Sequence, residues 1–201
     1  LDITVAEHAL EVARAAMESG VAKRPIEDWD AYQDRLNRFV FRSGLVMKPI
    51  VDRAQGKGKR IAFADGEDEG VLRAAQVVLE ERIARPILIG RPAVIEARIE
   101  RFGLSIQPGR DFEVINPEDD PRYRDYVSLF HSLVGRNGVT PDTARTIVRT
   151  NTTVIGALAV KRGEADGLIC GLQGRFIKHV RDIRSIIGLQ DGVNDASALS
   201  M

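Results

Sequence analysis

The chain has 201 residues, of which 44% are hydrophobic and 29% are charged, a balance typical of a globular protein with one good core. Lysine plus arginine and aspartate plus glutamate both number 29, and this zero net charge gives no support for nucleic acid or an anionic membrane as partner. No apolar run approaches the roughly 20 residues that a membrane-spanning helix needs.

The N-terminal part is predicted to be a helical leader. Apolar residues recur at helical spacing up to Gly20, a residue type that commonly follows a helix end, and a second helix is expected to stop at Gly44. The glycine-rich segment 55–59 is the expected boundary. We therefore divide the chain into a leader over residues 1–55 and a separate domain over residues 56–201.

Residues 60–92 have the pattern of a strand, a helix and a second strand. The apolar runs 61–64 and 86–89 can each be buried on both faces, and between them apolar residues recur at helical spacing. Two strands this close together predict a right-handed parallel unit. The acidic turn 65–70 is expected to cap the intervening helix. A metal site there is less favoured, since divalent ions usually take ligands from more than one segment.

Helices and strands continue to alternate along the rest of the chain. This alternation predicts an α/β fold with a mostly parallel sheet, whose ligands bind at the carboxyl ends of the strands. The further expected elements are helices over 92–102 and 121–133, helices that follow Thr140 and Asn151, strands over 112–115 and 167–170, and a last helix that ends at Gly188.

The strongest candidate for a binding site follows the last predicted strand. Gly171 and Gly174 frame a turn, and the free N–H groups of the next helix suit a phosphate or a carboxylate. Cations recur every third residue on that helix, and Phe176 is expected among the apolar residues that anchor its opposite side. A coenzyme A or nucleotide ligand suits this pattern, but a solvated basic face partly balanced by Asp182 stays open from spacing alone. The cations, here called the basic stripe, are Arg175, Lys178, Arg181 and Arg184.

Other reactive residue types are sparse. The three histidines are too scattered for a metal motif, so no metal site is predicted. Cys170 stands at a strand end, but no base is evident beside it and a structural thiol is favoured. As the single cysteine it fits a reducing cytoplasm. No GxGxxG nicotinamide fingerprint is present, and no catalytic residue is predicted.

The same segments carry a family resemblance. Residues 61–76 (IAFADGEDEGVLRAAQ) and 86–96 (PILIGRPAVIE) resemble the opening of the phosphotransacetylase family, which moves an acetyl group between coenzyme A and phosphate. The resemblance continues through residues 116–145 and ends in residues 165–188 (ADGLICGLQGRFIKHVRDIRSIIG). It implies the first subdomain of a three-layer, mostly parallel α/β fold.

Two further stretches narrow the resemblance. Residues 150–171 (TNTTVIGALAVKRGEADGLICG) and the leader over 13–49 are similar to the C-terminal half of large bacterial NADP-dependent malic enzymes, in which a malic-enzyme portion is fused to a phosphotransacetylase-like portion. The chain is therefore expected to be a piece of a longer protein.

The malic-enzyme resemblance implies a function for the longer protein and for this region. The parent would decarboxylate malate oxidatively to pyruvate with NADP and Mg²⁺ or Mn²⁺, bound upstream of Leu1. This region would bind acetyl-CoA as an allosteric inhibitor and hold subunits of a cytoplasmic homo-oligomer together. The leader would dock on the malic-enzyme portion, on another subunit or on the α/β layer.

The resemblance also carries expectations for single residues. Arg181 aligns with an arginine of the family's helix motif and is expected to contact acetyl-CoA, with Arg175 as a less secure second. Phosphotransacetylases usually have small hydroxyl residues where this chain has Gly174, Arg175 and Phe176, and an arginine near Val134. These departures predict that acetyltransferase activity is lost. An active phosphate acetyltransferase and a purely structural oligomerisation module are the alternatives. The expected acetyl-CoA contacts are Arg181, Arg175, Gly171, Gly174 and Lys178.

Overall fold

The computed structural model describes residues 3–193, apart from 23, 25 and 41–43. The chain forms two compact units, residues 1–54 and 55–201. This division lies next to the predicted boundary, while the assignment of the first unit to a malic-enzyme portion stays a prediction. Within the described residues, no helix is long and apolar enough to cross a membrane.

In the part of the first unit that the structure describes there are three helices, α1 (Ile3–Glu18), α2 (Trp29–Val40) and α3 (Gly44–Ala54). The carboxylate of Asp28 accepts a hydrogen bond from the Ala31 N–H at 2.9 Å and so caps α2. The guanidinium of Arg14 lies 5.4 Å from the ring centroid of Trp29, which joins α1 to α2. The sequence did not predict α3, because Gly44 was expected to end the preceding helix. The structure corrects this, since α3 begins at Gly44 and contains Pro49.

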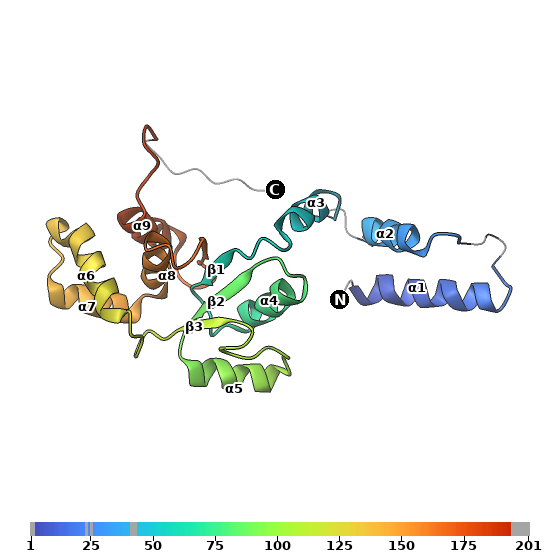
Figure 1. The fold of residues 1–201 in the computed structure, drawn as a ribbon, viewed down its shortest axis with the longest axis horizontal. Coiled ribbons are helices and arrows are strands. Elements are labelled where there is room, and N and C mark those ends of the chain that lie inside the picture. Colours follow the sequence, from blue (N-terminus) through green and yellow to red (C-terminus); the bar gives the residue numbers. More distant parts are fainter. Residues whose placement is uncertain (1–2, 23, 25, 41–43, 194–201) are drawn as a thin grey trace. The chain divides into compact units, whose positions relative to one another are not determined.

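The second unit is built on a four-stranded sheet (Figure 1). Its order is β3-β2-β1-β4, and every pairing is parallel, which confirms the predicted α/β class. In register, Ala62 of β1 lies between Ile87 of β2 and Leu168 of β4. The strands are β1 (Arg60–Phe63), β2 (Arg85–Ile89), β3 (Glu113–Ile115) and β4 (Gly167–Ile169).

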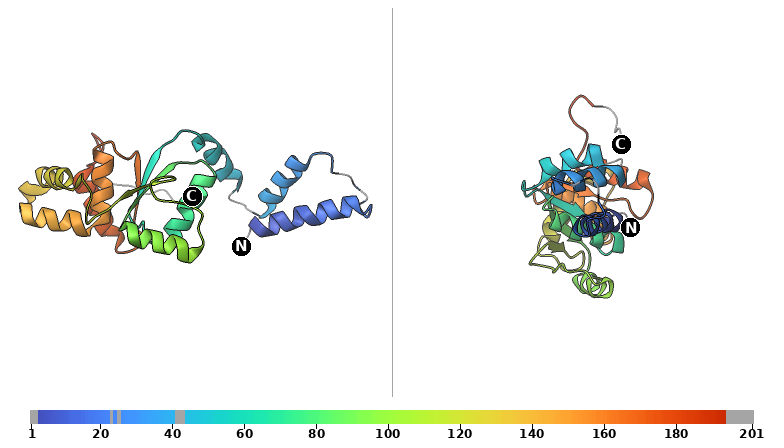
Figure 2. Two further views of the ribbon diagram at one scale, coloured as in Figure 1. Left: turned by 60° about the horizontal axis from the view of Figure 1, so that its bottom comes forward. Right: turned by 90° about the vertical axis from the view of Figure 1, so that its right-hand side faces the viewer.

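Helices cover both faces of this sheet (Figure 1 and Figure 2, left). Side chains alternate along β2, so that Ile87 and Ile89 belong to one core and Leu88 to the other, and all three are at most 2% exposed. The first core lies under α6 (Tyr123–Val134), α7 (Pro141–Thr150), α8 (Thr152–Lys161) and α9 (Phe176–Ile186), and the second lies under α4 (Glu69–Glu80) and α5 (Pro92–Phe102). A short 3-10 turn, η1 (Gly135–Asn137), follows α6.

The strand order places the candidate site. The chain moves from β1 to β2 and β3 on one side, and later returns to add β4 on the other side of β1. Sheets of this kind bind ligands where the order reverses, at the carboxyl ends of the strands. Here that point lies between the end of β1 and the end of β4.

A glycine in the turn after β1 is required by close packing against the end of β2. A Cβ atom on Gly66 would lie 2.8 Å from both the backbone N and the backbone O of Ile89, and Gly66 N–H donates a hydrogen bond to Ile89 O at 3.2 Å. We predict that Gly66→Ala lowers the free energy of unfolding by about 1–3 kcal/mol, because backbone must shift to admit the methyl group. Urea unfolding measures this. The matched change Gly70→Ala, whose Cβ would meet only the Asp68 side chain at 3.2 Å, should leave stability nearly unchanged; equal losses in the two variants would contradict the argument.

Candidate functional site at the carboxyl ends of the strands

The acidic turn after β1 uses its carboxylates as structural acceptors. Asp68 caps α4 by accepting a hydrogen bond from Gly70 N–H at 2.7 Å. Glu69 pairs with Arg73 one turn along the helix. Asp65 accepts a hydrogen bond at 3.2 Å from the N–H of Leu172, which is distant in sequence but follows the neighbouring strand β4. The predicted capping role is confirmed for Asp68, whereas Asp65 binds a residue outside α4. Within the described residues, no group of three or more His, Cys, Asp or Glu could hold a metal ion.

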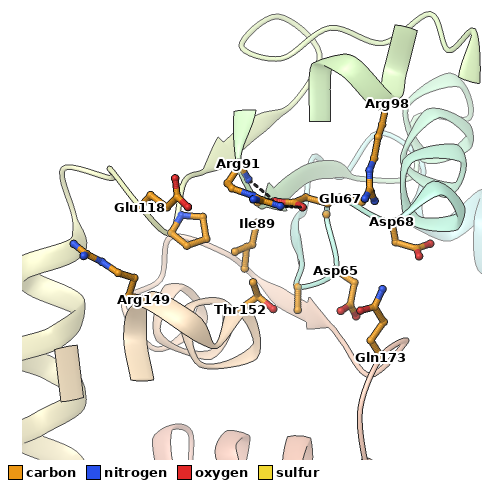
Figure 3. Close-up of a pocket in the computed structure, with 14 residues that line it drawn as sticks. Asp65, Glu67, Asp68, Ile89, Arg91, Arg98, Glu118, Arg149, Thr152 and Gln173 are labelled. Carbon is orange, nitrogen blue, oxygen red and sulfur yellow. Dashed lines mark hydrogen bonds and ion pairs between the residues drawn. The ribbon is translucent and has the colours of Figure 1, made fainter. Parts of the chain in front are cut away.

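A cavity of about 370 Å³ opens beside this turn (Figure 3). It lies at the carboxyl ends of β1 and β2, and the turn before α9 contributes Gln173 to its rim. Its wall mixes carboxylates and guanidinium groups, so it suits a polar ligand that has both donors and acceptors. The charged and hydroxyl side chains at the wall are Asp65, Glu67, Asp68, Arg91, Arg98, Glu118, Arg149 and Thr152.

An ion pair forms one wall of the cavity. Arg91 Nη2 and Glu67 Oε2 are 2.9 Å apart, and the Arg91 Nε and backbone N–H groups both donate to Glu67 Oε1 at 2.9 Å. Arg98 donates to the backbone carbonyl of Glu67. The hydrogen bond from the Arg91 side chain holds the pKa of Glu67 below its ordinary value, against the opposing effect of partial burial.

Arg149 and Thr152 form the opposite wall, at the junction of α7 and α8. The Arg149 guanidinium lies 5.3 Å from the Tyr123 ring centroid, and it makes no ion pair with any residue that the structure describes. Figure 3 shows it beyond Glu118, on the side of the cavity away from Arg98. It therefore offers an uncommitted cation at the rim.

The predicted glycine turn, residues 171–174, lies on the other side of Asp65. Gly171 and Gly174 have φ values of 99° and 98°, a region that favours glycine, so both glycines are required by the backbone. The Gln173 carbonyl accepts a hydrogen bond from His179 Nε2 at 2.8 Å. The turn thus places Gln173 between the cavity and the start of α9.

The basic stripe lies on the exposed face of α9, outside the cavity wall. Arg175 is the N-cap residue of α9 and makes no side-chain capping bond. Lys178 Nζ lies 3.8 Å from a carboxylate oxygen of Asp182, so part of its charge is balanced. Arg181 is exposed and has no ion pair within the described residues. The stripe and Gln173 are therefore neighbours, but none of the five predicted contact residues lines the cavity.

One prediction for α9 is wrong. Phe176 was expected to anchor the helix, but its side chain is 74% exposed, and Ile177 is 70% exposed. The buried anchor is Ile186, at 2% exposure. The reason is that α9 follows an exposed glycine turn. Residues 171–178 are all exposed, and the helix contacts the rest of the domain from His179 onwards.

The single cysteine is half-buried at the end of β4. Burial is the main cause that raises the pKa of the Cys170 thiol, and the negative charge of Asp65 raises it further, against a hydrogen bond with Thr153. A raised pKa disfavours the thiolate at neutral pH, which agrees with the prediction of a structural thiol.

Sequence reasoning missed most of the cavity. Glu67 and Arg91 are 24 residues apart and meet only because β1 and β2 are neighbours. Both stand directly after predicted strands, and the rule that ligands bind at carboxyl ends of parallel strands could have singled them out. Arg149 carries no such signal, because it lies at the end of a helix.

Comparison with known proteins shows which family the chain belongs to. The sequence pattern of the phosphate acetyl/butaryl transferase family matches residues 45–201. The chain belongs to this family. A solved phosphotransacetylase from Streptococcus pyogenes superposes with a TM-score of 0.69 and 26% identity, over 75% of this chain and 44% of that chain. The family match therefore covers the whole sheet and the site at its edge.

Two curated relatives are malic enzymes. The chain is 67% identical over 191 residues to an NAD-dependent malic enzyme of Rhizobium meliloti, and 47% identical over 189 residues to an NADP-dependent malic enzyme of Escherichia coli. Each alignment covers 94% of this chain and 25% of the relative. The chain thus spans about a quarter of the length of these relatives. The expected similarity to malic enzymes is confirmed, and it includes enzymes named for either coenzyme.

The ion pair in the cavity wall yields a prediction. Because the pKa of Glu67 is lower in the folded state than in the unfolded state, the pair stabilises the fold above the unfolded pKa of about 4.3, and this contribution is lost as the pH falls through the folded pKa. Glu67→Gln should cost about 1 kcal/mol at pH 7, discounted for the 51% exposure of Arg91.

Denaturant unfolding at several pH values measures this difference. It should shrink as the pH falls below about 4. Glu69→Gln, which breaks a pair whose side chains are both about half exposed, is the matched control and should cost only about 0.3 kcal/mol. A cost for Glu67→Gln that stays constant down to the lowest pH at which the protein folds would contradict the assignment.

Proposed function

We propose that this chain is a regulatory and oligomerising region of a malic enzyme, that it binds acetyl-CoA as an allosteric inhibitor, and that it lacks acetyltransferase activity. The observation that carries the proposal is the extent of the malic-enzyme similarity. The family pattern begins at residue 45, whereas the alignments span 189 and 191 residues and so include part of the helical first unit. A region that keeps its helical leader together with the α/β unit is built to work within the longer chain.

The parent reaction in this proposal is oxidative decarboxylation of malate to pyruvate and CO₂, with NADP as coenzyme and Mg²⁺ or Mn²⁺ as metal, in a cytoplasmic homo-oligomer. The coenzyme and the metal are bound outside this chain. Similarity within this chain therefore does not decide between NAD and NADP, and initial rates of the full-length protein with each coenzyme do.

Loss of acetyl transfer is supported by the surroundings of two positions. Val134, near which the family resemblance leads us to expect an arginine, is 4% exposed in the core between α6 and its neighbours, so it presents no cation to a ligand. At the start of α9, where phosphotransacetylases usually have small hydroxyl residues, this chain has Arg175 and the exposed ring of Phe176. A single missing group that stabilises developing negative charge costs about 10²–10³ in rate.

Binding of acetyl-CoA is supported by charge and position. The ligand carries several phosphates, and Arg181 and Arg175 are exposed cations beside a glycine turn at the ligand-binding edge of the sheet. Its polar groups can also reach the mixed donors and acceptors of the neighbouring cavity. Inhibition then requires that acetyl-CoA bind two states of the assembly with different affinity.

The first test concerns chemistry. Incubated with acetyl-CoA and phosphate, the protein should release no thiol above the uncatalysed rate, with an active phosphotransacetylase as the positive control. Turnover within a few orders of magnitude of a typical enzyme rate of about 10 s⁻¹ would falsify the claim of inactivity and favour a working acetyltransferase.

The second test concerns the basic stripe. Arg181→Ala in the full-length protein should weaken acetyl-CoA binding about tenfold or more, since a charge-assisted hydrogen bond contributes about 1.5–3 kcal/mol. Titration calorimetry measures the affinity, and inhibition should weaken in parallel while malate turnover without acetyl-CoA is unchanged. Arg124→Ala, another exposed arginine but on α6, is the control and should bind normally. Unchanged binding by Arg181→Ala would identify Arg181 as a solvated surface cation.

A further inference from the structure

The glycine turn is held by few hydrogen bonds of its own. Within the described residues, its links to the rest of the domain are the bond from Leu172 N–H to Asp65 and the bond from His179 Nε2 to the Gln173 carbonyl. With two glycines in its four residues, an untethered turn would populate many backbone conformations. Its shape therefore depends on these tethers.

The second tether continues into the core. His179 Nδ1 lies 2.9 Å from the hydroxyl oxygen of Thr153, which is 2% exposed in the middle of the first core. A carbonyl oxygen only accepts hydrogen bonds, so Nε2 of His179 carries the proton that reaches Gln173. In the neutral ring Nδ1 is then an acceptor, and the Thr153 hydroxyl donates to it.

The packing of α8 against α9 sets this geometry. Asn151, the cap of α8, also donates from its side-chain amide to a carboxylate oxygen of Asp182 on α9 at 2.8 Å. One helical turn earlier on α9, the His179 ring touches the turn itself, since a Cβ atom on Gly174 would lie 3.1 Å from Nε2. The His179 ring therefore lies between buried Thr153 and the turn. If the ring rotated away or changed tautomer, it would lose a hydrogen bond to one of these partners.

From this arrangement we propose that Thr153 and His179 are positioning residues, which hold the glycine turn in the conformation that receives the ligand. Thr153 orients the ring, the ring fixes the Gln173 carbonyl, and Gln173 stands between the cavity and the basic stripe. The role in ligand binding rests on the proposed function. The relay itself, defined as Thr153, His179 and the Gln173 carbonyl, does not.

The test compares full-length variants that differ by single atoms. Thr153→Val removes the hydroxyl but keeps the shape, and Thr153→Ser restores the hydroxyl. Thr150→Val is the matched control, because that hydroxyl donates within its own helix to Thr146 O at 2.8 Å. Acetyl-CoA affinity should fall about fivefold in Thr153→Val alone, and Thr153→Ser should bind like the unaltered protein.

Two measurements without ligand separate this inference from the proposed function. Hydrogen exchange of the amides of residues 172–175 should be about fivefold faster in Thr153→Val, with urea unfolding used to correct for global stability. NMR of the ring nitrogens should show His179 as the Nε2–H tautomer. If the unaltered protein does not bind acetyl-CoA, the proposed function fails, and exchange still decides the relay.

The inference is overturned if Thr153→Val exchanges and binds like the unaltered protein, or if the His179 ring carries its proton on Nδ1. A purely structural role would lower stability in Thr153→Val without a local change in exchange at the turn, and would also overturn it. Should Thr153→Val not fold, His179→Asn breaks the relay from the half-buried ring outside the core, and the same exchange and affinity changes are expected.

Discussion

The pairing of β1 with β4 is the constraint on which the rest of the site depends. At each end of this strand pair, a side-chain carboxylate accepts a hydrogen bond from a backbone N–H group. At the amino end, Asp166 accepts a hydrogen bond from Arg60 N–H at 2.9 Å; at the carboxyl end, Asp65 accepts one from Leu172 N–H, 107 residues away. Closing a loop of this length costs about 4 kcal/mol of chain entropy beyond a constant. The apolar α8, buried over residues 153–159 against this part of the sheet, offsets that cost by about 1.5–3 kcal/mol for each large side chain.

The helices and strands of the second unit are predicted well from the sequence, because several kinds of local pattern indicate the same element boundaries. Apolar runs, capping residues and closing glycines all mark the same boundaries, as at Asn151 before α8 and at Gly103 after α5. The first unit lacks this agreement. There, Gly44 was expected to end a helix, but α3 begins at that residue and continues through Pro49, a residue type that usually breaks a helix.

The candidate site was predictable only where it is local. The glycine turn is contiguous and its two positive φ values follow from residue type, so sequence located it. Glu67 with Arg91, and Thr153 with His179, are pairs joined by neighbouring strands or by helix packing. Sequence can place Glu67 and Arg91 after strands, but it does not show that either pair is in contact. Helical periodicity also misplaced Phe176, because it describes which residues share a face but not where along a helix the core begins.

Some charged side chains at this edge of the sheet form ion pairs with one another, and others do not. Glu67 with Arg91, and Lys178 with Asp182, neutralise one another and add little net attraction for an anion. Arg149 and Arg181 are exposed and have no ion pair within the described residues, so each can attract an anion, although the carboxylates of Asp65, Asp68 and Glu118 share the cavity wall with Arg149. Val134, by contrast, is 4% exposed in the core and presents no charged group to a ligand. The Val134 side chain instead belongs to the first core, which α6 covers. Apolar packing therefore fixes α6 in place, and the exposed cations that have no ion pair in the part of the chain that the structure describes stand apart from that packing.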